Sequence, residues 1–421
     1  HSAFTWTTHL GRRVDVLTLA PLVVASLARQ ATHDWLYSRV AATQPTLSLL
    51  AGGAETQVTR RLTTGRTSTY WNPKHQGALA CTASGGVWLE ARKHSAGYTA
   101  TALCQGCGTA LGTLQHRLYD CPLLAPWRSF ALDFDTIEAG RTATDDHPLF
   151  CRGLLPSTWL PHWTRCTDGP ALSWTARGDD GSGTLSGHVF TDGSLVSPDQ
   201  PRYCAGGWSV VQIHPSTHRV HVAYQGRVPY DDLDTTACEI YALLMSLTFV
   251  CGHITVHVDN AEVGHGMSRG QGYCVGAANK HAHLWRLVWA KLEDLGGSVE
   301  QWLSVVHVPA HTTQADVDAG VLTAFERSGK ARADGLARAQ AKLAGPPPEV
   351  LATVTKLLSA QKCIVGLWIG EATVRSFSFI QPDATRAPAV RSAPKATAPR
   401  AQAPSAACSD PRPTSARADT P

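Results

Sequence analysis

The sequence has no large excess of charge of either sign and contains few charged residues overall. Charged side chains make up 17% of the 421 residues, and the formal net charge is +4. The segment 381–421 holds six Arg or Lys against three Asp, so it contributes +3 and the rest of the chain is nearly neutral. Charge alone therefore does not identify a nucleic-acid-binding protein.

The sequence also contains no apolar run close to the roughly 18–20 residues of a membrane span, and no signal peptide. We therefore expect no membrane association. Twelve cysteines without a secretory signal, some at metal-ligand spacing, indicate a reducing, intracellular compartment rather than a disulfide scaffold. The chain begins with His1 rather than Met, so we expect the C-terminal piece of a longer product, in which missing targeting signals carry little weight.

The sequence does contain enough apolar residues to form a hydrophobic core. With 43% hydrophobic residues, 13 Trp and 421 residues in all, two or three domains are expected. Composition divides the chain into a helical or irregular region of unknown role (1–100), a Cys/His segment (101–122), a linker region (123–186), an α/β domain (187–345), a C-terminal helical extension (346–380) and a disordered Ala/Pro/Arg-rich tail (381–421).

Residues 187–345 have the clearest pattern of elements. Three β-rich runs at 187–192, 203–213 and 219–228 are separated by turn-sized gaps, which is typical of an antiparallel meander. The later elements are helices at 235–250, 280–295 and 329–343 and strands at 254–259 and 299–308. This order predicts an α/β layer fold with a mixed sheet.

Four acidic residues recur at positions where an α/β sheet gathers functional side chains. Asp192 ends the first strand, Glu239 lies early in the first helix, Asp259 ends the fourth strand, and Asp334 lies in the last helix. Carboxylates brought together in this way repel one another unless cations are bound. Hard oxygen ligands suit Mg²⁺ or Mn²⁺, and two such ions can serve phosphoryl displacement.

Short motifs around these residues carry a family resemblance. They are TDGS at 191–194, GGW at 206–208, ACEIYALL at 237–244, VDN at 258–260, VPAH at 308–311 and KARADGLA at 330–337. With these motifs, residues 187–345 resemble a type 1 ribonuclease H domain. The resemblance implies a mixed five-stranded sheet with flanking helices, and an endonuclease that hydrolyses the RNA strand of an RNA–DNA hybrid with two Mg²⁺ or Mn²⁺ ions, leaving 5′-phosphate and 3′-hydroxyl ends.

The resemblance also implies a role for each residue of the site. Asp192 would bridge both metal ions, and Asp334 would complete the site of the ion that activates the attacking water. Glu239 and Asp259 would hold the ion that stabilises the leaving 3′-oxygen. His311 would lie on a mobile loop and assist proton transfer or product release, which suits a side chain that titrates near neutrality.

Substrate contacts are expected next to these residues, from Gly193, Ser194 and Asn260. A bound hybrid would be held chiefly through its backbone and shape, and 2′-hydroxyl groups would distinguish RNA from DNA. Sequence preference should therefore be slight.

Two features depart from the family pattern. Lys330 stands where the family usually carries Asn, so the local hydrogen bonding should differ. The stretch between His311 and Asp334 is longer than in compact members, and Asp316 and Asp318 within it could be mistaken for ligands. Asp334 is the preferred ligand, because ADGLA opens a helical pattern.

A second candidate metal site lies in the Cys/His segment. Four soft ligands fall within eighteen residues, with glycines that allow a tight knuckle: Cys104, Cys107, His116 and Cys121. This spacing predicts one structural, tetrahedral Zn²⁺ with Cys₃His ligation. The alternatives are a buried Cys pair with a fortuitous His, or a redox CxxC, which lacks a surrounding βαβ unit.

This segment also resembles the zinc-binding segment that follows the reverse transcriptase domain in non-long-terminal-repeat retroelements. No YxDD-type polymerase motif is present, so these residues cannot themselves copy RNA, and a polymerase would lie upstream. Retroelement ancestry suggests a nuclear location for the protein. RNA–DNA hybrid is the expected partner, and the sequence leaves protein partners unknown.

Two other functions are open at this point. One is a nucleic-acid-binding protein whose ribonuclease H fold has lost its activity, although all four carboxylates are present. The other is a transposase- or integrase-like strand transferase, which the separate Glu239 and Asp334 positions disfavour.

Overall fold

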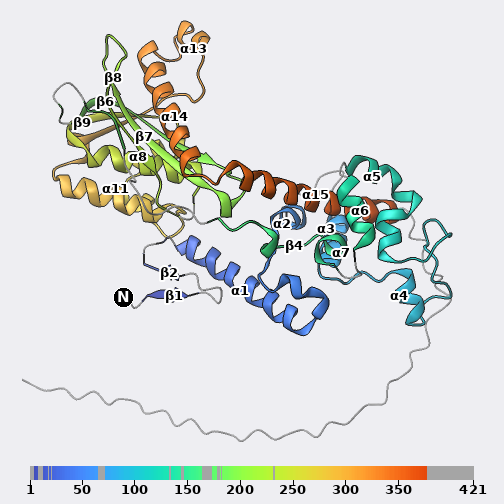
Figure 1. Ribbon diagram of the computed structural model, residues 1–421. Helices are drawn as coiled ribbons and strands as arrows, with labels where there is room; N and C mark the ends of the chain where they lie inside the picture. The colour runs from blue at the N-terminus through green and yellow to red at the C-terminus, as the bar shows by residue number, and fades with distance from the viewer. Residues whose placement is uncertain are drawn as a thin grey trace, which may run out of the picture. The chain divides into compact units, whose positions relative to one another are not determined.

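A computed structural model describes residues 4–7, 13–17, 19, 21–64, 72–131, 134–143, 147–163, 173–177, 181, 183–230 and 233–376. The tail 381–421, expected to be disordered, lies outside these residues. Within the described chain, an α/β part and a mostly helical part can be distinguished by their elements (Figure 1).

The α/β part is built on one mixed sheet with the strand order β10-β9-β6-β7-β8-β5. β6 pairs in parallel with β9, and β9 with β10, while the β6–β7, β7–β8 and β8–β5 pairs are antiparallel. The strands are β5 (Ser173–Arg177), β6 (Leu185–Val196), β7 (Ala205–Ile213), β8 (Val220–Arg227), β9 (Val250–Val258) and β10 (Leu303–His307). The predicted mixed sheet is confirmed with all five strands, and β5 adds a sixth from the region expected to be a linker.

Helices cover both faces of this sheet. The helices of this part of the chain are α8 (Thr235–Thr248), α9 (Ala261–Arg269), α10 (Gln271–Cys274), α11 (Ala282–Leu295), α12 (Val299–Trp302), α13 (Gln314–Asp318) and α14 (Ala324–Ala344), with a 3₁₀ turn η5 (Pro201–Tyr203). α8 packs on β6 and β7 and contacts α11, and α14 packs on the same strands from the other side (Figure 1).

The two faces follow from the alternation of side chains along each strand. On β6, Val189 enters the core beneath α8 and α11, while the next residue, Phe190, joins the core beneath α14. Val210 and Val211 divide in the same way on β7. Both faces are apolar, so the central strands are buried on both sides.

Several predicted boundaries differ from the structure. The first strand continues to Val196, so Asp192 lies within β6 rather than at its end, and β9 begins at Val250 rather than at residue 254. Residues 299–308 were expected to be one strand, but α12 occupies Val299–Trp302, because Ser298 and Gln301 form a capping box that begins a helical turn. The last helix begins at Ala324 rather than near residue 329, since Thr323 and Glu326 form another capping box. Asp334 therefore lies in the middle of α14 rather than opening it.

The helical part contains only short strands. Its elements are β1 (Thr5–Thr7), β2 (Arg13–Asp15), α1 (Pro21–Thr43), η1 (Pro45–Leu50), β3 (Ala54–Glu55), α2 (Gln57–Thr64), α3 (Pro73–Ala83), α4 (Glu90–Ser95), η2 (His116–Asp120), η3 (Pro122–Leu124), α5 (Ala125–Ala131), α6 (Phe134–Thr142), α7 (Pro148–Arg152), β4 (Leu155–Pro156), η4 (Ser157–Trp159) and α15 (Pro348–Ser376). The region 123–186 thus contains helices α5, α6 and α7.

One segment of α15, Pro348–Glu371, is long and apolar enough to cross a membrane by length and composition alone. No such segment was expected from the sequence. Ile364 and Leu367 on this helix are fully buried in an apolar cluster with Leu118 and Tyr119. Core helices of soluble proteins have the same length and hydropathy, so this finding is weak evidence for a span.

Candidate functional site

Three of the four predicted carboxylates meet in the α/β part. Asp192 lies on β6, Asp259 directly follows β9, and Glu239 lies in the second turn of α8. One oxygen from each of the three lies within 4.8 Å of the others. They come together because β6 and β9 are parallel neighbours and α8 packs on β6.

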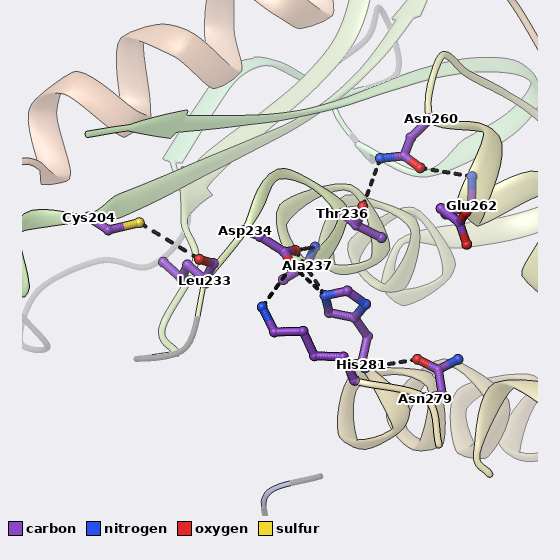
Figure 2. A network of polar contacts seen from close by, with 10 residues as sticks. Cys204, Leu233, Asp234, Thr236, Ala237, Asn260, Glu262, Asn279 and His281 are labelled. Carbon is purple, nitrogen blue, oxygen red and sulfur yellow. Dashed lines mark hydrogen bonds and ion pairs between the residues drawn. The ribbon is translucent and has the colours of Figure 1, made fainter. Parts of the chain in front are cut away.

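The local sequence holds α8 and the end of β9 in place. Asp234 caps α8 by accepting a hydrogen bond from the Ala237 amide at 2.8 Å. Asn260, the residue after Asp259, donates to Thr236 Oγ1 at 3.2 Å and thereby ties the end of β9 to the first turn of α8 (Figure 2). Both anchors lie within a few residues of a clustered carboxylate.

Burial dominates the electrostatics of the cluster. Asp192 is 5% exposed and Glu239 is 2% exposed. Burial raises the pKa of the Asp192 carboxyl, and it raises the pKa of Glu239 well above the usual range. Glu239 Oε2 has no hydrogen-bond partner among the described residues. A buried carboxylate oxygen without a partner, beside two further carboxylates, is suited to binding a hard divalent cation such as Mg²⁺ or Mn²⁺.

A positive group that was not predicted for the site lies inside the same cluster. The Lys330 side chain is 8% exposed, and its Nζ donates to Asp192 Oδ1 at 2.9 Å and to the Thr191 carbonyl at 2.7 Å. Nζ also lies 3.1 Å from Asp259 Oδ1. Burial works to lower the pKa of this ammonium, but the surrounding carboxylates raise it on balance. The signal in the sequence was the Lys at a position where the family usually carries Asn.

The fourth predicted carboxylate lines the same cavity but is not part of the close group. Asp334 and His311 both line a cavity of about 490 Å³ together with the clustered carboxylates. Both Asp334 oxygens accept hydrogen bonds from Arg338 Nη2 at 2.7 Å. His311 is exposed in the segment after β10, with a left-handed φ of 53° that is uncommon outside glycine.

The three residues predicted to contact substrate line the cavity but differ in their other contacts. Ser194 and Asn260 line the cavity. Asn260 is also the N-cap of α9 and accepts a hydrogen bond from the Glu262 amide (Figure 2). Gly193 lines the cavity and packs against the backbone of α8. Asp316, the alternative ligand, caps α13 through Thr313 instead.

The Cys/His segment forms a second compact group. One ligand atom from each of Cys104, Cys107, His116 and Cys121 lies within 4.8 Å of the others. Cys107 Sγ is 3.1 Å from His116 Nε2, and Cys104 Sγ is 3.9 Å from Cys121 Sγ. Gly108, at a φ of 68°, turns the chain so that its amide donates to the Cys104 carbonyl. The four donors match a tetrahedral zinc site in number and type.

The thiols of this group differ in their environment. Hydrogen bonds from the side chain and backbone of Thr109 lower the pKa of the Cys107 thiol to about 6. Burial raises the pKa of Cys121. The thiolate is the form that binds metal, so the Thr109 contacts favour ligation by Cys107, whereas Cys121 would lose its proton when the metal binds.

An ion-pair network that the sequence did not indicate adjoins this group. Arg117 follows the ligand His116, is buried, and contacts Glu90 at 3.5 Å and Glu371 on α15. Leu118 and Tyr119, the next residues, are fully buried. The Cys/His group is therefore continuous with the core that α15 helps to form.

Comparisons with known proteins give only remote similarity. No protein-family model and no curated protein matches the chain. The chain is similar to the solution structure of the PFV RNase H domain, with 18% identity over 37% of this chain and 94% of that chain and a TM-score of 0.28. It is also similar to the Prototype Foamy Virus protease-reverse transcriptase (20% identity, 37% of this chain, TM-score 0.28), of which it spans 20%.

A third similar structure is the foamy viral protease-reverse transcriptase in complex with an RNA/DNA hybrid. Identity is 16% over 44% of this chain and 22% of that chain, with a TM-score of 0.27. At these scores the functional assignment depends on the residues of the site rather than on the matches.

Proposed function

We propose that the chain is a metal-dependent endonuclease that hydrolyses the RNA strand of RNA–DNA hybrids. The observation that carries this proposal is the convergence of three buried or half-buried carboxylates from β6, α8 and β9 at one cavity, with Glu239 Oε2 lacking a partner among the described residues. The order and spacing of the motifs that resemble ribonuclease H support the choice of reaction.

Asp192, Glu239 and Asp259 would hold the divalent ions, with Asp334 as a further ligand. When bound, such ions supply the positive charge that stabilises the attacking and leaving oxygens of an in-line displacement. The protein's own contribution is to hold the carboxylates together and to line the reaction site. His311, exposed at the cavity, is positioned to exchange a proton with solvent or product.

The cavity wall supports a polyanionic substrate. Arg327 and Arg338 line the cavity along with the carboxylates. Guanidinium groups bind phosphate oxygens without reading base sequence, so backbone contacts of this kind would give slight sequence preference. Gly193, Ser194 and Asn260 are proposed as neighbouring substrate contacts.

The Cys/His group is proposed as a structural zinc site rather than part of the reaction. All four of its donors are protein side chains, which closes the coordination shell of a tetrahedral ion. Its ligand segment leads directly into buried core residues, so zinc binding would stabilise the helical part of the chain.

A second candidate function is nucleic-acid binding without cleavage. The buried Lys330 ammonium favours it, because a fixed positive charge beside Asp192 and Asp259 satisfies carboxylates that metal ions would otherwise bind. Cleavage measurements distinguish the two candidates.

The test is cleavage of a strand-labelled RNA–DNA hybrid by the full chain, in Mg²⁺ and then in Mn²⁺. Asp192→Asn removes the charge with little change of shape and should reduce activity by about 1,000-fold or more, because charge stabilisation at such a site is worth several kcal/mol. Asp316→Asn is the matched control, since Asp316 caps α13 and should leave cleavage unchanged.

Cleavage of the RNA strand alone by the wild type, with loss in Asp192→Asn, supports the proposed function. Binding of the hybrid by both proteins without cleavage contradicts it and supports the second candidate. Joining of DNA ends would instead indicate a strand transferase.

A further inference from the structure

The proposed ribonuclease function assigns no role to the Lys330 side chain. It reaches from α14 into the carboxylate cluster, 138 residues along the chain from Asp192, and its ammonium group is buried. Three oxygen atoms lie around Nζ at 2.7–3.1 Å: one carbonyl oxygen of Thr191 and one carboxylate oxygen each of Asp192 and Asp259. An ammonium group has three N–H donors, so these oxygens can satisfy all of them.

Nζ lies among the carboxylate oxygens where a metal cation would bind. Two of its three oxygen neighbours belong to the carboxylates that the proposed function assigns to divalent metal. A divalent ion bound to the same carboxylate oxygens would lie within a few Å of the ammonium charge, and the repulsion between the two cations would weaken metal binding while Nζ stays in place.

The charges of the cluster also indicate that Lys330 weakens metal binding. Asp192, Glu239 and Asp259 carry three negative charges when ionised, and Lys330 cancels one of them. The cluster therefore keeps a negative charge that attracts a divalent ion, but less than it would have without Lys330. The other basic residues that line the cavity are His311, Arg327 and Arg338, of which Arg327 binds Gln314 and Arg338 binds Asp334.

We infer that Lys330 is a built-in competitor of the divalent metal: its ammonium group occupies a cation position in the carboxylate cluster, and metal binding displaces it. This inference rests on the metal site of the proposed function. Lys330 is a positioning residue in the metal-free protein, where it holds Asp192 and Asp259 together. Its displacement frees a positive side chain at the edge of a cavity that is proposed to bind phosphates.

The first test is Mn²⁺ binding to the full chain, followed by the electron paramagnetic resonance signal of free Mn²⁺. Lys330→Met keeps an unbranched side chain, one atom shorter, and removes the charge and the donors. It should bind Mn²⁺ about tenfold more tightly or better, because a unit charge a few Å away is worth at least one factor of ten in affinity inside a protein. Lys342→Met, on the exposed surface of the same helix, is the matched control and should bind as the wild type does.

The outcomes separate this inference from the proposed function. Equal or weaker Mn²⁺ binding by Lys330→Met, beside clear binding by the wild type that Asp192→Asn abolishes, overturns the inference and leaves the metal site intact. If neither protein binds Mn²⁺ at the cluster, the inference and the metal site both fail. Binding by Lys330→Met alone would overturn the displacement of Lys330 by metal in the wild type, because the ammonium group would then exclude the metal, and it would contradict metal-dependent activity of the wild type.

A second measurement needs no variant and so does not depend on Lys330→Met folding. Lysine acylation of the wild type, followed by mass spectrometry of the peptides, reports how accessible each amine is. Lys330 should react slowly in chelator and several times faster at a Mn²⁺ concentration that saturates the cluster, while Lys342 should react equally in both. An unchanged rate at Lys330 under saturating Mn²⁺ would mean that the metal does not displace the ammonium group.

Discussion

Gly193 lies directly against the backbone of Glu239. A Cβ atom added to Gly193 would be 2.4 Å from the Glu239 amide nitrogen and 2.5 Å from the carbonyl carbon of Cys238. Real Cβ atoms do not approach main-chain atoms so closely, so only glycine allows β6 and α8 to pack at this spacing. Because Gly193 follows Asp192, the same contact sets the distance between two of the clustered carboxylates.

Gly193→Ala should therefore disturb both stability and the site. We expect the free energy of unfolding to fall by about 1–3 kcal/mol, the usual cost of overpacking, and Mn²⁺ binding to weaken as Glu239 moves away from Asp192. Denaturant unfolding and Mn²⁺ titration measure the two effects. Gly264→Ala in α9 is the control, because no atom lies within 4 Å of its Cβ position and a helix interior favours Ala. If Gly193→Ala has the same free energy of unfolding as the wild type, α8 can move away from β6 without cost, which would contradict this prediction.

Glu239→Gln should stabilise the metal-free protein. Burial holds the Glu239 pKa above its unfolded value, so the folded chain binds more protons than the unfolded chain between those two pKa values, and stability falls as pH rises through that range. The neutral amide removes this loss, and we expect a gain of about 1–3 kcal/mol at neutral pH, the scale of an unsatisfied buried group.

The measurement is a pH series of denaturant unfolding in chelator, compared with the same series in Mn²⁺. In Mn²⁺ the order should reverse, because the ionised Glu239 is a stronger ligand for a divalent ion than the neutral amide of Gln. If the free energy of unfolding of the wild type and of Glu239→Gln depends on pH in the same way in chelator, ionisation of Glu239 does not destabilise the folded protein and the prediction is wrong.

Zinc should be present at about one ion per chain in protein purified under reducing conditions. Cys121→Ser should lose this zinc and destabilise the helical part, since Cys121 is buried next to the core residues Leu118 and Tyr119. Elemental analysis and thermal unfolding measure both. Cys81→Ser changes an exposed thiol on α3 and should keep the zinc. Reduced wild-type protein without stoichiometric zinc would remove the assignment.

Asp234 should stabilise the site through the start of α8. Its carboxylate caps the helix and lies 2.9 Å from His281 Nε2 (Figure 2). It also accepts a hydrogen bond from Lys280 Nζ at 3.0 Å. Asp234→Ala should cost about 1–2 kcal/mol of unfolding free energy, the range for loss of a helix cap. Asp234→Asn keeps an acceptor for the cap and should cost less.

The charge of Asp234 also predicts a pH dependence. Burial alone would raise the Asp234 pKa, but hydrogen bonds and charge from His281 and its other partners lower it on balance. A lowered carboxyl pKa contributes stability above the unfolded value and loses it as pH falls through the folded value. The difference between wild type and Asp234→Asn should therefore shrink below about pH 4 in unfolding experiments. A constant difference down to pH 2 would contradict this role.

Local patterns predicted most of the α/β elements, because strand alternation and helical periodicity are properties of neighbouring residues. Two of the misplaced boundaries have equally local causes: a capping box at Ser298 begins a helical turn where a strand was expected, and one at Thr323 begins the last helix before residue 329. Helices α9 and α10 were not predicted, since their segment contains four glycines within residues 261–274. They form because Asn260 caps the first helix and because Val263 and Cys274 are buried.

The sequence by itself predicted four carboxylates for the site, from the order of strands and helices that carry them, and it predicted a Cys₃His ligand set from spacing. Only the tertiary structure decided which of these groups touch. It brought Asp192, Glu239 and Asp259 within 4.8 Å, left Asp334 paired with Arg338, and inserted Lys330 among the carboxylates. The reason is physical: distances between side chains on different strands and helices depend on how the helices pack on the sheet, and pairing and burial depend on those distances.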